Sequence, residues 1–170
     1  MNMRKQQGFT IIEVVLVLAI AGLIFLMVFI ALPALQKSQR DTQRRNDVSR
    51  LRAQINQFQA NQKGVIPTVA QMQNTAIGGF VNQYLKNSGG WVDPKSGNQY
   101  PTPITYNTDF ATTLGSTDDK AGNWTYEDDA KCTSGADSFT LGTALVPIGA
   151  RAYAVAMKLE GAGFVCQDNQ

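Results

Sequence analysis

Glu13 is the one charged side chain within a long apolar segment, and its chemistry depends on what compensates that charge. The segment reads GFTIIEVVLVLAIAGLIFLMVFIALPALQ over residues 8–36, and the next charged residue is Lys37. A carboxylate in apolar surroundings is costly unless a positive charge or hydrogen-bond donors compensate it. Glu13 is therefore expected either to reach the aqueous edge of an apolar phase or to form one half of an ion pair.

Other residue types narrow the chemistry further. The chain contains no histidine, the commonest general base and transition-metal ligand, and no serine in a nucleophile elbow. We therefore expect no enzyme activity and no bound cofactor. Clustered acids in the distal part could offer oxygen ligands to calcium, but their spacing fits no calcium-binding loop, so solvated loop charges are the expected state. These acids are Asp118, Asp119, Glu127, Asp128 and Asp129.

The elements that position Glu13 begin with a membrane-inserted helix. Residues 14–35 contain no charged or strongly polar side chain over 22 positions, and a helix needs about 20 to cross a bilayer core. A core helix of a soluble protein would show a polar face, and a cleaved secretory signal would have a shorter apolar run of about 7–15 residues. Pro33 lies inside the helix and should kink or locally melt it.

The helical pattern continues beyond the apolar run. Residues 36–62 contain no glycine and no proline, and their apolar residues recur at helical spacing on one face. Gly64 followed by Pro67 ends the pattern. This half of the helix is amphipathic and needs a partner surface. The apolar stripe consists of Val48, Leu51, Ile55 and Phe58.

The N-terminus resembles that of type IV prepilins. A basic leader ends in Gly8, Phe9 follows, and Glu13 precedes an uninterrupted apolar helix, so the similarity covers about residues 1–60. In that family a membrane peptidase cuts after the glycine and methylates the new N-terminal phenylalanine. The resemblance therefore implies cleavage between Gly8 and Phe9 and N-methylation of Phe9. Gly22 falls where such helices often carry glycine, and we group it with Pro33 as a kink position.

The resemblance also implies a partner for Glu13. After cleavage, Phe9 carries a free α-amine in apolar surroundings, and Glu13 of one subunit can meet the Phe9 amine of a neighbour. Such a pair would fix the axial register of a bundle, as one buried polar residue does in a coiled coil. The alternative is that Glu13 only snorkels to the membrane surface.

A pilin-like organisation follows from these patterns. The implied partners are identical subunits in a helical filament, the prepilin peptidase and the pilus assembly platform in the membrane, with no small-molecule substrate and with nucleic acid left open. The protein would be a single-pass cytoplasmic membrane protein before assembly and part of an extracellular pilus afterwards. The expected regions are a leader at 1–8, an apolar transmembrane and filament-core helix at 9–35, the amphipathic half at 36–62 and a globular head at 63–170.

The distribution of basic residues conflicts with an extracellular position of the head. Seven basic and two acidic residues lie between positions 37 and 63, against Arg4 and Lys5 before the apolar run. The positive-inside rule would therefore keep the head in the cytoplasm. The export of heads in the pilin family favours an extracellular head, and so do the two distal cysteines, which are more readily explained as oxidised. The basic segment could also contact DNA phosphates, but a solvated or filament-internal helix face is the expected state.

The head is expected to be an α+β domain with a mainly antiparallel sheet that receives the apolar stripe. Short helices are expected within residues 65–90, and strands at 104–106, 123–126, 138–146, 151–159 and 163–167. In an exported domain Cys132 and Cys166 are expected to form a disulfide, which would close a loop of about 35 residues and contribute up to ~4 kcal/mol; two buried free thiols are the alternative. Trp91, Tyr100, Trp124 and Tyr126 are expected to be core or sheet aromatics.

The function expected from the sequence is that of a structural subunit of a type IV pilus. A secretion pseudopilin or a minor tip pilin shares every N-terminal feature and remains the main alternative. A membrane-anchored extracellular binding domain is the alternative from another class.

Overall fold

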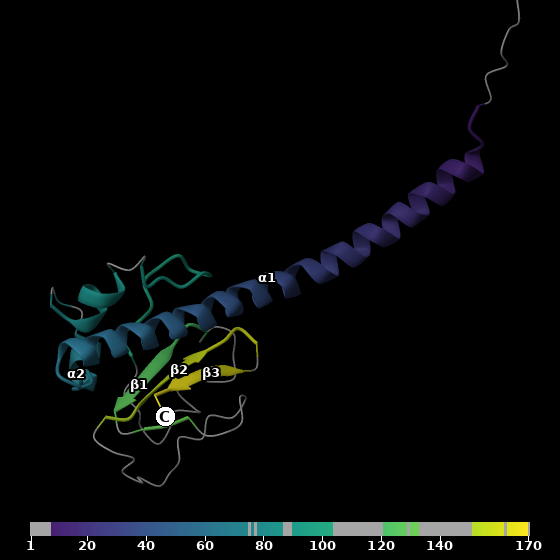
Figure 1. Cartoon of the computed structure of the whole chain (residues 1–170). Coiled ribbons are helices and arrows are strands. Elements are labelled where there is room, and N and C mark those ends of the chain that lie inside the picture. Colours follow the sequence, from purple (N-terminus) through teal and green to yellow (C-terminus); the bar gives the residue numbers. More distant parts are fainter. Residues whose placement is uncertain are drawn as a thin grey trace, which may run out of the picture. The chain divides into compact units, whose positions relative to one another are not determined.

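The computed structural model has the predicted α+β layout, a long N-terminal helix followed by a three-stranded antiparallel sheet (Figure 1). The chain forms two compact units, one ending at Lys37 and one beginning at Ser38. The elements are α1 (Ile11–Asn61), α2 (Val69–Gln73), the π-helical turn η1 (Val81–Leu85), β1 (Trp124–Asp128), β2 (Tyr153–Lys158) and β3 (Phe164–Asp168). The structure describes residues 8–74, 76, 78–86, 90–103, 121–128, 130–132, 151–161 and 163–169.

Helix α1 is α-helical without a break past Gly22 and Pro33. Pro33 has no N–H to donate to the carbonyl of Phe29, so one bond of the helical ladder is missing at this turn. The helix is nevertheless continuous through Pro33, so the expected local melting is wrong for this structure. A bend at Gly22 or Pro33 stays a prediction.

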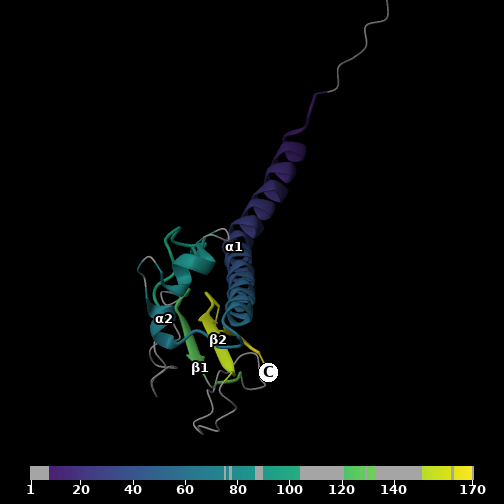
Figure 2. The same ribbon diagram turned by 60° about the vertical axis from the view of Figure 1, so that its left-hand side comes forward.

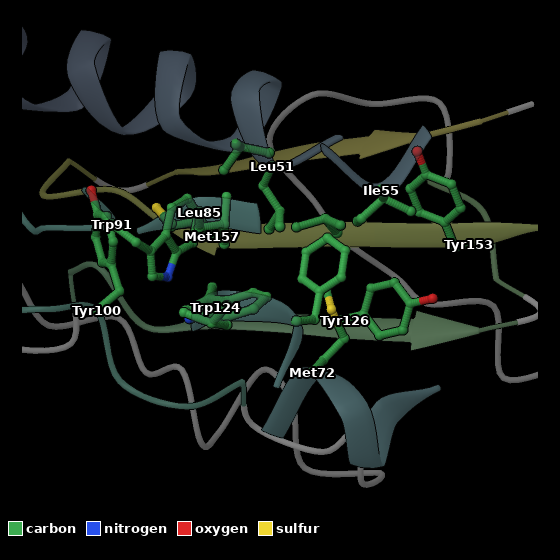
Figure 3. Packing of buried hydrophobic residues seen from close by; sticks show 14 of the residues in the cluster. Leu51, Ile55, Met72, Leu85, Trp91, Tyr100, Trp124, Tyr126, Tyr153 and Met157 are labelled. Atoms are coloured by element: carbon green, nitrogen blue, oxygen red, sulfur yellow. The ribbon is translucent and has the colours of Figure 1, made fainter. Parts of the chain in front are cut away.

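The amphipathic half of α1 buries the predicted stripe against the sheet. Val48, Leu51 and Ile55 are fully buried, and Phe58 nearly so. In both views this half of the helix runs along the sheet (Figures 1 and 2). The side chains of Leu51 and Ile55 face those of β1 and β2 (Figure 3). The stripe residues share one core cluster with Trp124, Tyr126, Tyr153, Val155 and Met157.

The sheet has the order β1-β2-β3 with both pairs antiparallel. Alternate residues of β2 enter the core, and their register across β1 pairs Tyr126 with Val155 and Trp124 with Met157. Every residue of β2 is buried, so the strand is covered on both faces. Three expected strands are confirmed within one or two residues of their predicted ends. Those expected at 104–106 and 138–146 lie outside the described residues.

Two short helical turns precede the sheet, as expected. α2 begins with a capping box, because Thr68 and Gln71 exchange side-chain to backbone hydrogen bonds. Pro67 therefore precedes the N-cap and lies outside α2. The expected core aromatics are confirmed, since Trp91, Tyr100, Trp124 and Tyr126 are at most 4% exposed.

A disulfide joins Cys132 to Cys166, with the two Cα atoms 6.0 Å apart, which is the predicted pairing. Cys166 lies in β3, opposite Ala156 of β2. The bridge therefore ties the segment after β1 to the last strand. Asp168, two residues on, reinforces this link by accepting a hydrogen bond from the backbone N–H of Cys132 at 2.6 Å.

Candidate functional sites: the N-terminal segment and a buried charge cluster

Glu13 closes a capping box at the start of α1. Both the backbone N–H and the hydroxyl of Thr10 donate to Glu13 Oε2, at 2.9 and 2.8 Å, and the N–H of Glu13 donates to Thr10 Oγ1 at 3.4 Å. In such a box the two side chains satisfy N–H groups that the first helical turn leaves without partners. The spacing T-x-x-E signals this box in the sequence, where Glu13 was interpreted only as a charge in apolar surroundings.

The capping box gives the Glu13 carboxylate hydrogen-bond donors within its own chain. In the unassembled chain the carboxylate has two donors from its own helix start and is exposed to its surroundings. Both donors use Oε2, which leaves lone pairs on Oε1 for a positive charge from outside the chain. Gly8 and Phe9 precede the cap, and Phe9 is 90% exposed.

The apolar half of α1 presents a continuous unpartnered surface. Every Val, Leu, Ile, Met and Phe side chain from Phe9 to Leu35 is at least 45% exposed. By length and composition this part of the helix can cross a membrane. Burying one such side chain fully is worth about 1.5–3 kcal/mol, so the surface requires lipid or other apolar helices around it.

A cluster of charged side chains is buried in the second compact unit. Arg44 is fully buried and binds three carboxylates. Its Nε and Nη2 atoms donate to Asp93 Oδ1 at 3.0 and 2.6 Å, and Nη1 donates to Glu160 Oε1 at 2.9 Å and Asp41 Oδ1 at 3.1 Å. We call Arg40, Asp41, Arg44, Asp93 and Glu160 the Arg44 cluster.

The Arg44 cluster fastens α1 to the connection between β2 and β3. Arg40 binds Glu160 with two parallel hydrogen bonds of 2.7 Å. Asp41 accepts hydrogen bonds from the backbone N–H groups of Glu160 and Gly161, at 2.8 and 3.2 Å. The bonds from Arg40, followed by those from Arg44, lower the pKa of Glu160 to about 2.

A second set of contacts continues along the same helix face. Asp47 accepts hydrogen bonds from the Tyr100 hydroxyl at 2.9 Å and from Arg50 at 3.1 Å. Arg50 also donates to the backbone carbonyl of Gly90. Burial raises the pKa values of both Asp47 and Tyr100. These contacts hold residues 90–100 against α1.

The charged half of α1 is therefore different from what the sequence suggested. A solvated or filament-internal face was expected, and this is wrong for Arg44, and in part for Arg40 and Arg50, whose side chains are 26% and 30% exposed. The i, i+3 pairs Asp41–Arg44 and Asp47–Arg50 were visible in the sequence as a signal of paired charges. Arg45, by contrast, is exposed as expected.

The acidic residues considered for calcium are only partly within the described chain. Glu127 and Asp128 lie in strand β1, where the sequence placed loop residues. Asp118, Asp119 and Asp129 lie outside the described residues. Among the residues that the structure describes, no group of three or more acidic or cysteine side chains is arranged to hold a metal ion.

Comparison with known families identifies the N-terminal segment. Residues 3–29 match the prokaryotic N-terminal methylation motif, the class III signal peptide of type IV pilins. This match covers only the N-terminal segment, and it supports a type IV pilin-like protein. The motif implies processing by prepilin peptidase and assembly into a filament, and with the apolar helix it fits a membrane-anchored precursor. No curated protein and no solved structure matched the chain in these comparisons.

Proposed function

We propose that the protein is a structural subunit of a type IV pilus, cut after Gly8, N-methylated at Phe9 and assembled through the apolar half of α1. One observation carries the proposal. The methylation motif at residues 3–29 overlaps the first half of α1, and the large apolar side chains of this half, as far as Leu35, are all exposed. Such a surface is stable in lipid and equally stable in a bundle of identical helices, which is what transfer from membrane to filament requires.

Glu13 is proposed to set the register of that bundle. The new ammonium of Phe9 needs a counter-charge once it leaves the aqueous edge of the membrane. Glu13 of a neighbouring subunit can supply it through Oε1, while Thr10 continues to bond Oε2. The capping box orients the carboxylate before the neighbour arrives, because both Thr10 donors bond to Oε2.

The partners proposed are copies of this chain, the prepilin peptidase and the assembly platform in the membrane. A small-molecule substrate is not part of the proposal. The basic residues that would have offered DNA a phosphate-binding face are partly consumed in ion pairs within the head, which weakens the nucleic-acid alternative.

A pseudopilus subunit or a minor tip pilin is the second candidate, because both share the motif and the helix start with a major pilus subunit. A membrane-anchored binding domain would retain its apolar helix in lipid permanently. A major pilus subunit, a pseudopilus or minor pilus subunit, and a membrane-anchored domain differ in where the mature chain accumulates.

We expect the mature protein to be abundant in filaments sheared from the cell surface. Mechanical shearing followed by sedimentation and immunoblotting of both fractions measures this directly. A pseudopilus subunit or a minor pilin would give mature protein chiefly in the membrane fraction with traces in the sheared material. Protein confined to membranes in every growth condition would contradict a filament subunit.

A further inference from the structure

The outward face of the second half of α1 carries a single charge. Within residues 41–60 only the charged side chain of Arg45 is exposed, and the others are buried or half-buried against the head: Asp41, Arg44, Asp47, Arg50 and Arg52. The remaining exposed positions are neutral: Thr42, Gln43, Asn46, Ser49, Ala53, Asn56, Gln57 and Ala60. Charged residues are normally the exposed ones, whereas the core of a protein interface is depleted of charge. This inverted distribution indicates a face that another molecule covers.

A second copy of the chain is the occupant that this face fits. The face belongs to the same helix as the apolar surface that the proposed function assigns to packing between identical subunits, and the present inference rests on that function. Its neutral positions can be covered without leaving a charge unpaired. Arg45 is the exception, because a guanidinium that is buried without a carboxylate is costly. The copy that covers the face therefore has to supply an acid.

Asp128 is the acid that the copy can supply. It lies at the end of β1, and among the described residues after Lys37 it is the only acid that is exposed. The carboxylates of the Arg44 cluster and of Asp47 are already engaged inside the head. Within the described chain neither Asp128 nor the guanidinium of Arg45 has an ion pair. One arginine and one carboxylate are thus left over on two different surfaces.

The two groups are too far apart along α1 to meet within one chain. Asp128 pairs with Tyr153 in the register of β1 and β2, and the Tyr153 hydroxyl donates to Asn56 Oδ1 at 2.7 Å. Asp128 therefore lies near the level of Asn56. Helix α1 rises about 16 Å between Arg45 and Asn56, which is more than an arginine side chain spans. The contact requires a neighbour that is displaced along the helix.

We propose that Arg45 of one subunit forms an ion pair with Asp128 of a neighbouring copy, and that this pair closes the neutral face of α1 against that copy. Arginine suits this role because its planar guanidinium can bind a carboxylate through two parallel hydrogen bonds. The contact joins two different surfaces, so it repeats along a filament and does not close a dimer. It acts between heads, whereas Glu13 acts within the apolar half of α1.

A charge exchange in the full-length chain tests the pair. Arg45→Glu and Asp128→Arg should each lower the yield of sheared filaments at least about tenfold, because each places like charges opposite one another. The mature membrane pool should stay within about twofold of the native level, since neither side chain holds the head together. The double variant should regain at least about half of the native yield, because the pair forms again with its charges exchanged.

Lys95→Glu is the matched control. It makes the same change of charge at another exposed basic residue of the head and should leave the filament yield within about twofold of native. Combined with Asp128→Arg it should give no rescue. Normal yield from either single variant of the pair, failure of the double variant to recover, or equal rescue by Lys95→Glu would overturn the proposal. A native chain that forms no filaments would instead contradict the proposed function.

Discussion

Glu13→Gln is expected to abolish filament growth while membrane insertion and cleavage after Gly8 remain intact. The substitution removes the negative charge that the neighbouring Phe9 ammonium needs inside the bundle. Leaving one such charge uncompensated costs on the order of 3–5 kcal/mol per subunit. Each subunit repeats the loss, so even the lower value would stop growth. Insertion should be equal or better, because a neutral side chain is cheaper to place in lipid.

The capping box makes this substitution unusually selective. Glutamine at the third helical position can still bond to the backbone N–H of an N-cap residue, as Gln71 does with Thr68 in α2. The start of α1 should therefore survive in Glu13→Gln, and a loss of assembly would reflect the charge and not an unravelled first turn.

The measurement compares the mature membrane pool with the sheared filament fraction in cells that express only the variant. Co-expression with the native chain gives the internal control, because a few uncompensated subunits can be carried within a native filament. Normal filament yield from the variant alone would mean that Glu13 snorkels to the membrane surface and that the register argument is wrong.

Arg44→Met is expected to destabilise the head by about 3–5 kcal/mol. Methionine fills part of the same space but leaves Asp41, Asp93 and Glu160 buried with less compensation, and breaking a buried ion pair on one side is strongly destabilising. Denaturant unfolding followed by tryptophan fluorescence measures the change, since Trp91 and Trp124 lie in the core. Arg45→Met is the matched control on the exposed face and should stay within about 0.5 kcal/mol.

Acid should narrow the gap between the native chain and Arg44→Met. The pKa of Glu160 is lowered from 4.5 to about 2 in the folded head by Arg40 and then Arg44. A lowered folded-state pKa gives stability that is present above pH 4.5 and is lost as the pH falls toward 2. The variant retains only the Arg40 share of this stabilisation. A constant difference between pH 6 and pH 2.5 would show that Glu160 is not the acid concerned.

The parts of the fold that follow from local pattern could be predicted from the sequence. The 3.6-residue spacing of Val48, Leu51 and Ile55 placed the stripe correctly, because burial on one face of a helix leaves that period in the sequence. The alternation of Tyr153, Val155 and Met157 with alanines placed β2, because successive residues of a strand point to opposite faces of the sheet. The T-x-x-E box at Thr10 was equally local and could have been predicted.

The Arg44 cluster could be predicted only in half. Asp41 and Arg44 lie three residues apart on one helix, but Asp93 and Glu160 reach them from 49 and 116 residues away. Such partners depend on how the loops pack, which no local period encodes. A buried arginine in a polar helix segment thus looks the same in sequence as the exposed Arg45 beside it.

N-terminal mass spectrometry of protein sheared from cells tests the central claim most directly. The account predicts a mature chain that begins at Phe9, lacks residues 1–8 and carries one methyl group on its α-amine. Replacing Gly8 with a bulky residue should leave the full-length precursor in the membrane. Filaments built from chains that begin at Met1, that are cut elsewhere or that carry an unmethylated Phe9 would contradict the account.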